Sequence, residues 1–115
     1  MILESRSILF SDEELLVAFG DAIEAATEDK SIEAVSVNSA LDDQGEVVVR
    51  FKLSDGSDLT FESGDVGPAV LNHCIRVGIP LPRGSYKELA IRGEHVALIV
   101  RLETGVGVGG EGDEY

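Results

Sequence analysis

The chain has 115 residues, of which 43% are hydrophobic, and a formal net charge of −13. This length suits one domain with a buried core, and the hydrophobic content excludes a disordered chain. No apolar run approaches the ~20 residues of a membrane span, and the negative charge repels nucleic acid and anionic membranes. The lone cysteine, Cys74, fits a reducing compartment. We therefore expect a cytoplasmic protein that contacts neither nucleic acid nor membrane.

The chain opens with a short extended segment and a helix. The extended segment ends at Phe10, and Ser11-Asp12-Glu13-Glu14 has the order of a capping box, in which the Ser hydroxyl accepts from a free backbone amide. Apolar residues then recur at a spacing of four, at Leu15, Phe19 and Ile23. This stripe predicts one helix over residues 12–27 with a single buried face.

Three strand segments follow, over residues 32–40, 46–53 and 57–62. In the first segment we expect Val35 and Val37 to face the core. In the second, apolar residues lie opposite Arg50 and Lys52, at Val47, Val49, Phe51 and Leu53. Asp55-Gly56 joins the second and third segments and predicts a hairpin with a type I′ turn, which requires positive φ.

A second helix is framed by Pro68 near its start and Gly78 just past its end. Its predicted buried stripe consists of Val66, Val70, Leu71, Cys74 and Ile75. Pro80 and Pro82 make the next connection stiff and extended. Strands are predicted over 86–92 and 95–103, and the second of these is apolar on both faces, which indicates a central or covered strand. Residues 104–115 are Gly-rich and acidic and are predicted to form a flexible tail after a single domain over 1–103.

A short pattern occurs twice in the chain. Acidic, aliphatic, Ala and large apolar residues follow Phe10 and Phe61 at the same offsets of four, five, eight and nine. Repeats of this kind indicate a duplicated structural unit. We therefore predict an α+β fold of two β-α-β-β units, pseudo-duplicated, with an antiparallel sheet packed against two helices.

The order of elements over residues 11–103 is helix, three strands, helix and two strands. This order resembles that of the class I chaperones of type III secretion, although the final helix of those chaperones has no counterpart here. The resemblance implies a small, acidic, cytoplasmic and dimeric protein that binds other proteins. It lies at the level of topology, so it assigns no individual residue a role.

Three groups of residues contain side chains or glycines typical of catalytic, metal or phosphate sites, but their spacing does not fit such a site. His73 and Cys74 are neighbours on a helix and point about 100° apart, so they do not form a nucleophile–base pair, and Cys74 lies on the apolar stripe. Asp42, Asp43 and Glu46 offer calcium-type oxygens but lack the ligand order of an EF-hand, and a solvated turn explains them better. The glycines of the tail lack the Lys-Ser/Thr ending of a phosphate loop. We predict no catalytic residue, no metal site and no cofactor.

A local excess of basic residues follows the second helix. Residues 1–65 hold 16 acidic and 4 basic residues, whereas residues 66–103 hold 3 acidic and 5 basic ones. The candidate binding residues are Arg76, Arg83, Tyr86, Lys87 and His73. Of these, Arg83 and Lys87 flank the proline connection, which can present them to an anion or an acidic partner, although exposed basic residues are commonly plain surface.

The main functional hypothesis is a non-enzymatic protein-interaction module of adaptor or chaperone-like type. Its partner would be another protein, and the acidic half of the chain would attract a basic one. One alternative is a small-molecule or anion-binding protein, or an enzyme, that uses the loop over 79–87. A second alternative is an acidic mimic of nucleic acid, with carboxylates of residues 12–46 along one face. A symmetric homodimer is also expected, formed through a sheet edge or a helix face in the less acidic half.

Overall fold

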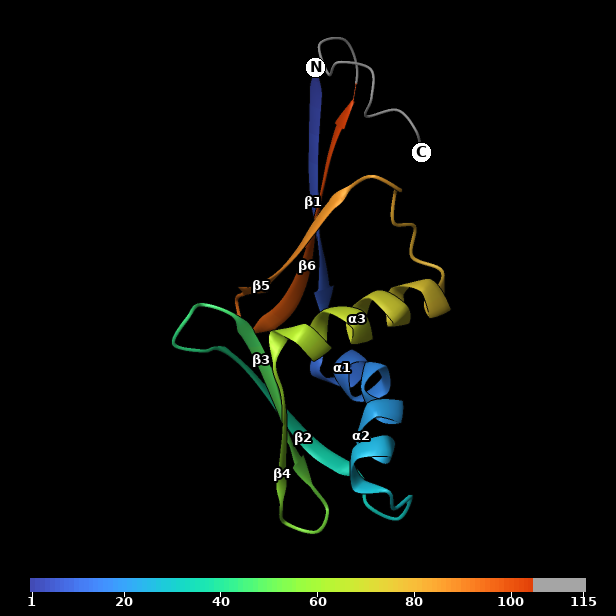
Figure 1. Cartoon of the computed structure of the whole chain (residues 1–115), viewed down its shortest axis with the longest axis vertical. Helices are drawn as coiled ribbons and strands as arrows, with labels where there is room; N and C mark the ends of the chain where they lie inside the picture. The colour runs from blue at the N-terminus through green and yellow to red at the C-terminus, as the bar shows by residue number, and fades with distance from the viewer. Residues whose placement is uncertain (105–115) are drawn as a thin grey trace.

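A computed structural model describes residues 1–104 of the chain (Figure 1). Its elements, in chain order, are β1 (Ile2–Phe10), α1 (Asp12–Ala18), α2 (Gly20–Thr27), β2 (Ala34–Leu41), β3 (Val47–Leu53), β4 (Asp58–Phe61), α3 (Ser63–Val77), β5 (Tyr86–Arg92) and β6 (His95–Thr104). The predicted α+β class is confirmed. Thr104, assigned from the sequence to the tail, belongs to β6, and the rest of the predicted tail lies outside the described residues.

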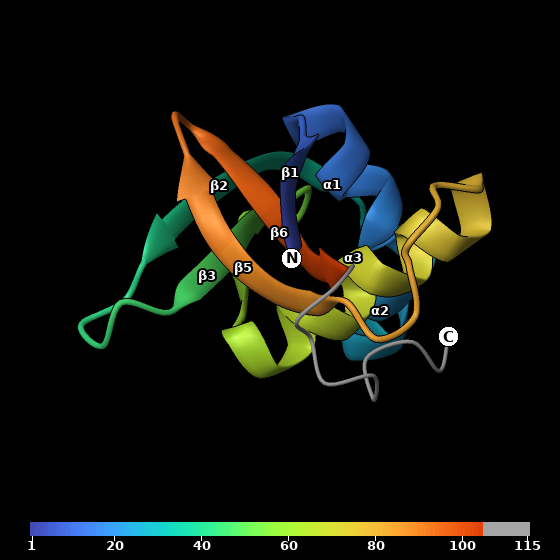
Figure 2. The ribbon, with the colours of Figure 1, turned by 90° about the horizontal axis from the view of Figure 1, so that it is seen from above.

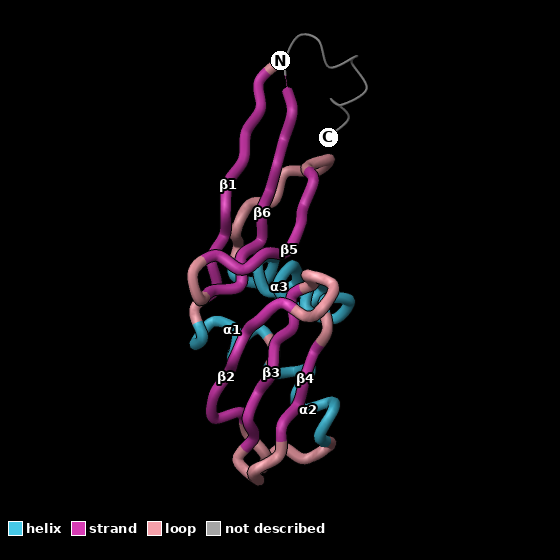
Figure 3. Tube along the Cα trace, turned by 90° about the vertical axis from the view of Figure 1, so that its left-hand side faces the viewer, coloured by secondary structure: helices cyan, strands magenta, loops and turns pink. Residues whose placement is uncertain are grey.

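The strands form two antiparallel sheets of three strands each, where one sheet and two helices were expected. The upper sheet has the order β1-β6-β5 and the lower sheet the order β2-β3-β4 (Figure 3). Helix α3 lies across the junction of the two sheets, and α1 and α2 lie beside the lower one (Figures 1 and 2). The molecule is elongated, with extents of 56 × 29 × 19 Å, and the ends of β1 and β6 extend beyond the helices.

Each sheet takes one edge strand from the other half of the chain. β1 pairs with β6 of the second half, and β4 pairs with β3 of the first half. A duplicated β-α-β-β unit that exchanged its first strand would produce this order. Phe10 and Phe61 both contact the main core, the first buried and the second half-buried. The pseudo-duplication itself is not confirmed, because no rotation relating the two halves is established.

The first predicted helix is divided in two. Phe19, with φ −97° and ψ 4°, ends α1 and precedes Gly20, the first residue of α2. The Phe19 side chain is fully buried, and its ring centroid lies 5.1 Å from that of Phe51 and 4.9 Å from that of Phe61. Sequence periodicity missed this break because the apolar spacing of four continues across it, while glycine propagates a helix poorly.

The first residues of β2 depart from simple alternation. Ala34 lies opposite Leu53 and Ser36 opposite Lys52, so Val35 is an extra residue at an irregularity in the ladder. A residue inserted in this way changes which side chains face inward. Val35 is therefore 61% exposed, contrary to the prediction, while Val37 is half-buried as part of the core.

The hairpin between β3 and β4 is confirmed, but its turn type is not I′. Gly56 has φ +88°, whereas Asp55 keeps a negative φ. The Gly56 amide donates to the Leu53 carbonyl at 2.9 Å, and the Leu53 amide donates to the Ser57 carbonyl at 2.8 Å. This is the longer hairpin loop in which a single glycine takes the left-handed position.

The central strands of the two sheets carry most of the β-sheet core. In β3 the predicted alternation is confirmed, with the four apolar residues buried and Arg50 and Lys52 exposed. In β6 five consecutive residues, 96–100, are buried, as expected for a central strand. The core lies where these two strands meet the buried faces of the helices.

Candidate functional site

A mostly apolar, open groove runs between α3 and the connection that follows it. We call this feature the α3 groove. It is lined by Pro68, Leu71, Asn72, Ile75, Gly78, Ile79, Leu81, Pro82, Arg83 and Lys87. It therefore contains two of the five predicted binding residues, together with apolar residues that the sequence assigned to the core.

Helix α3 supplies one wall of the groove because it carries two apolar stripes. One stripe faces the core and consists of Val66, Val70, His73 and Cys74. The other, at positions 68, 71, 72 and 75, has the same spacing of three or four and faces the groove. Ile75 is 69% exposed, so its predicted burial is wrong. Pro68, predicted near the start of the helix, lies in its interior, because α3 begins at Ser63.

The connection after α3 supplies the second wall, and backbone hydrogen bonds hold it in place. Gly78 adopts a left-handed conformation with φ 83°, and the Ile79 amide donates to the Cys74 carbonyl at 2.9 Å, which closes the helix end. Pro82 O accepts from the Ser85 hydroxyl at 2.5 Å. Arg6 of β1 donates to the carbonyl of Pro80. The wall is thus formed before any ligand arrives.

Two cations border this apolar surface. The exposed Arg83 lies on the loop, and the half-buried Lys87 lies at the start of β5. Lys87 Nζ donates to the carbonyl of Ser85 at 3.2 Å. Among the described residues that line the groove none is acidic, so within this part of the chain a carboxylate or another anion would find donors without a competing negative charge.

The other three predicted binding residues lie elsewhere. Arg76 faces α2, where its guanidinium is 3.6 Å from the carboxylate of Asp21. Tyr86 precedes Lys87 on a strand, so the two side chains point to opposite faces of the sheet. The Arg101 guanidinium lies 5.2 Å from the Tyr86 ring centroid.

His73 joins α3 to α1 within the protein. It is 3% exposed, and its Nε2 lies 2.6 Å from a carboxylate oxygen of Glu14. Its Nδ1 is buried without a hydrogen-bond partner among the described residues. The neighbouring Cys74 is fully buried, and burial raises the pKa of its thiol, which keeps the sulfur protonated and unreactive at neutral pH.

The turn over residues 42–46 is stabilised by its own atoms. Asp42 Oδ1 accepts from the backbone amides of Gln44 at 2.8 Å and Glu46 at 2.9 Å. Its carboxylate therefore serves the turn, in agreement with the preferred interpretation of this segment. Within residues 1–104, no group of three or more His, Cys, Asp or Glu side chains is placed to hold a metal ion.

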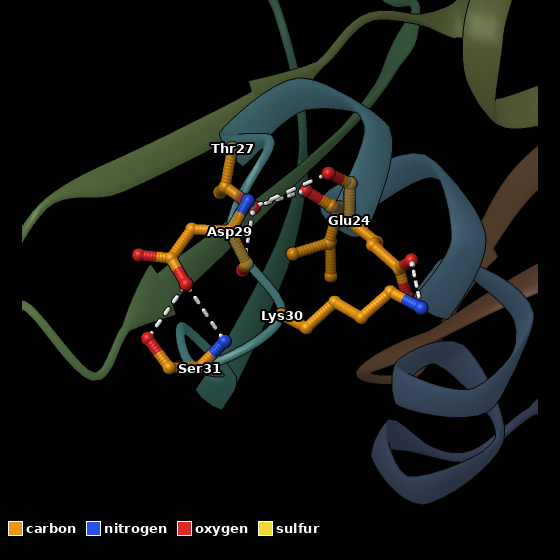
Figure 4. A network of polar contacts seen from close by, with 6 residues as sticks. Glu24, Thr27, Asp29, Lys30 and Ser31 are labelled. Carbon is orange, nitrogen blue, oxygen red and sulfur yellow. Dashed lines mark hydrogen bonds and ion pairs between the residues drawn. The ribbon is translucent and has the colours of Figure 1, made fainter.

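The acidic end of the molecule, formed by α2 and the loop after it, is internally bonded (Figure 4). Asp29 accepts from the Ser31 hydroxyl at 2.6 Å and from its amide at 2.9 Å, and these bonds lower the pKa of Asp29. Lys30 Nζ lies 3.6 Å from a carboxylate oxygen of Glu24. A nucleic-acid mimic would need free carboxylates along one face, but those of Asp29 and Glu24 already bond to residues of this chain.

Comparisons with known proteins do not assign the chain to a group. No protein-family model, curated protein or solved structure matches it. The likeness to type III secretion chaperones consequently remains one of element order. None of the helices in residues 1–104 combines the length and the apolar character needed to cross a membrane.

Proposed function

We propose that this protein is a cytoplasmic, non-enzymatic interaction module whose α3 groove binds a segment of a partner protein. The inserted segment would present apolar side chains beside a carboxylate. The observation that carries the proposal is the 69% exposure of Ile75 on an apolar surface bordered by Arg83 and Lys87. Exposed apolar surface rimmed by polar groups commonly marks an interaction site.

Burial of apolar area would supply most of the binding free energy. Transfer of apolar surface out of water stabilises a complex by roughly 25 cal/mol per Å². The exposed Ile75 and the half-buried Leu71 provide apolar surface that a bound segment could cover. The hydrogen-bonded loop wall reduces the entropy lost on binding, because little of the site needs to become ordered. Both features support recognition of a peptide segment.

Charge would then select among segments. Arg83 and Lys87 favour an inserted Asp, Glu or chain-terminal carboxylate, whereas the formal net charge of −13 favours a partner that is basic overall. A basic protein with one acidic, apolar segment meets both requirements. The groove is open along its length, and this shape suits a chain segment better than a small ligand, which is usually enclosed on most sides.

Selection from a library of random 12-residue peptides displayed on phage would test this proposal with the purified full-length protein. We expect the selected peptides to combine apolar residues with Asp or Glu. Their affinity, measured by fluorescence anisotropy, should fall at least about tenfold in Ile75→Glu, because a carboxylate would replace apolar contact surface. Val77→Glu is the matched control, since Val77 is 55% exposed on the same helix but does not line the groove.

Charge reversal at Arg83 and Lys87 provides a second test, of whether these two cations select an acidic side chain. The R83E/K87E variant should prefer selected peptides in which Asp or Glu is replaced by Lys. Failure to select any peptide, or equal losses in Ile75→Glu and Val77→Glu, would contradict the proposal. Inorganic phosphate that shifts the NMR signals of Arg83 and Lys87 at millimolar concentration, without any peptide binding, would instead support the anion-binding alternative.

A further inference from the structure

β1 is a long edge strand with one unpaired side. It pairs with β6 over nine consecutive residues without a register shift, and β6 is its only strand partner among residues 1–104. Figure 3 shows β1 as the outermost strand of the upper sheet, with α1 of the described chain meeting it only near its lower end. Such an edge exposes a row of backbone donors and acceptors that can pair with another strand.

The other edge strands are less suited to pairing. β4 has only four residues, β2 contains the irregularity at Val35, and β5 contacts β2 and β3 of the lower sheet. Short edges and bulges are common means of preventing unwanted strand association. β1 has neither protection. It also exposes apolar side chains, with Ile2 60% and Leu3 66% exposed.

The sequence of β1 is complementary to itself in one register. In a two-fold symmetric antiparallel pair, opposite residues lie on the same face, so one residue of β1 must lie opposite its own copy. Centring the pair on Glu4 or Arg6 would oppose like charges. Centring it on Ser5 places Glu4 opposite Arg6 of the second copy, twice per dimer, and Ile2 opposite Ile8.

We propose that two copies of this chain associate through β1, centred on Ser5, and form a continuous six-stranded antiparallel sheet. Cross-strand pairs of opposite charge stabilise a sheet, and like charges directly opposite destabilise it. Arg6 uses one nitrogen for the Pro80 carbonyl, and its guanidinium has further donors for Glu4 of the second copy. The surface differs from the α3 groove, so this inference does not depend on the proposed function.

The proposed interface lies in the more acidic half of the chain, contrary to the expectation from the sequence, but β1 itself has no net charge. β1 holds one acidic and one basic residue, whereas the first turn of α1 holds three acidic residues. Ala97 and Ile99, which make β6 apolar on both faces, are already buried within a single chain and need no partner chain to cover them. The β1 edge is therefore the feature that supports self-association.

Cysteine substitutions test the register. In Ser5→Cys, the two sulfur-bearing residues would lie opposite each other with Cα atoms about 4.5–5.5 Å apart, which fits a disulfide. We expect rapid covalent dimer formation under mild oxidation of the full-length protein. Ser7→Cys is the matched control, because Ser7 is also exposed on the same face but would lie opposite Leu3. Equal cross-linking of both variants, or faster cross-linking of Ser7→Cys, would overturn the register.

Sedimentation equilibrium tests the association itself. We expect a dimer at tens of micromolar protein and physiological salt. Glu4→Arg should raise the dissociation constant about tenfold or more, because arginines would then oppose each other at two places, and the E4R/R6E double variant should restore it. A monomeric native protein, or a double variant no tighter than Glu4→Arg, would overturn the proposal.

Discussion

The two sheets have corresponding strand orders, but their central strands differ in whether the outer face is buried or exposed. In the lower sheet, β3 has one buried face and one face that exposes Arg50 and Lys52. In the upper sheet, β6 is buried on both faces from Val96 to Val100. Strand order alone therefore does not determine the environment of a central strand. The side chains of its neighbours decide it.

Those neighbours can be identified on the outer face of the upper sheet. Glu88 of β5 lies opposite Ile99, and Tyr86 lies opposite Arg101. Arg101 forms an ion pair with Glu88 and lies over the Tyr86 ring. The hydrocarbon portions of such long polar side chains cover apolar surface while their charged ends stay in water. This cluster explains how Ile99 is 4% exposed although it is not part of the main core cluster.

The largest expected effect is in the lower sheet. Phe51→Ala removes a ring that packs against both Phe19 and Phe61, and it should lower the free energy of unfolding by about 3–5 kcal/mol. Lys52→Ala, on the exposed face of the same strand, should change it by less than about 0.5 kcal/mol. Urea denaturation followed by circular dichroism measures both. Similar losses in the two variants would contradict the one-sided burial of β3.

Substitutions on the two faces of β6 should differ less in their effect on the free energy of unfolding than those on the two faces of β3. Leu98→Ala opens a cavity in the main core and should cost about 2–5 kcal/mol, while Ile99→Ala should cost roughly half as much because only a surface cluster covers it. The comparison uses the same denaturation measurement. An equal loss in Ile99→Ala would mean that the outer face of the upper sheet is packed as fully as the inner one.

Cys74 probes how well the core between the two sheets is closed to solvent. Cys74→Ala should lower the free energy of unfolding by about 1 kcal/mol, through the small cavity that it leaves. The native thiol should react slowly with a thiol reagent, because it is fully buried and burial raises its pKa. Labelling should become fast in 8 M urea. Rapid labelling of the folded protein would show that the helix face opens more readily than its packing implies.

The smallest expected effect concerns the loops at the far end of the lower sheet. Hydrogen bonds from Ser31 lower the pKa of Asp29, and hydrogen bonds from Ser57 lower that of Asp55. A carboxyl whose pKa is lower in the folded state stabilises the fold above its unfolded pKa. That contribution is lost as the pH falls from about 3.8 through the folded-state value.

The matched variants Ser31→Ala and Ser57→Ala separate these two carboxyls. NMR titration should show the pKa of Asp29 rising toward its ordinary value in Ser31→Ala, with that of Asp55 nearly unchanged, and the reverse in Ser57→Ala. Because both carboxyls are exposed, acid stability should change only slightly. If neither pKa moves, the seryl hydrogen bonds do not cause the shifts.

Local pattern was enough to predict most elements of the fold. The alternation in β3, the capping serine of α1, the glycine end of α3 and the central position of β6 all follow from short-range spacing. For the α3 groove, the loop and its two basic residues could be predicted, but the helix wall could not. Ile75 looks like a core residue because an apolar side chain on a helix does not reveal which of two adjacent stripes is covered. Leu71, on the same stripe, is half-buried and does pack against the core.

Local sequence patterns therefore specify the kind, order and approximate bounds of the elements, because capping, turn geometry and hydrophobic periodicity depend on residues close together in the chain. Three features depend instead on the folded arrangement: β1 joins β6 while β4 joins β3, Phe19 interrupts a helix to enter the core, and Ile75 stays exposed. These outcomes depend on contacts between residues far apart in the chain, whose free energies outweigh local preference where the two conflict.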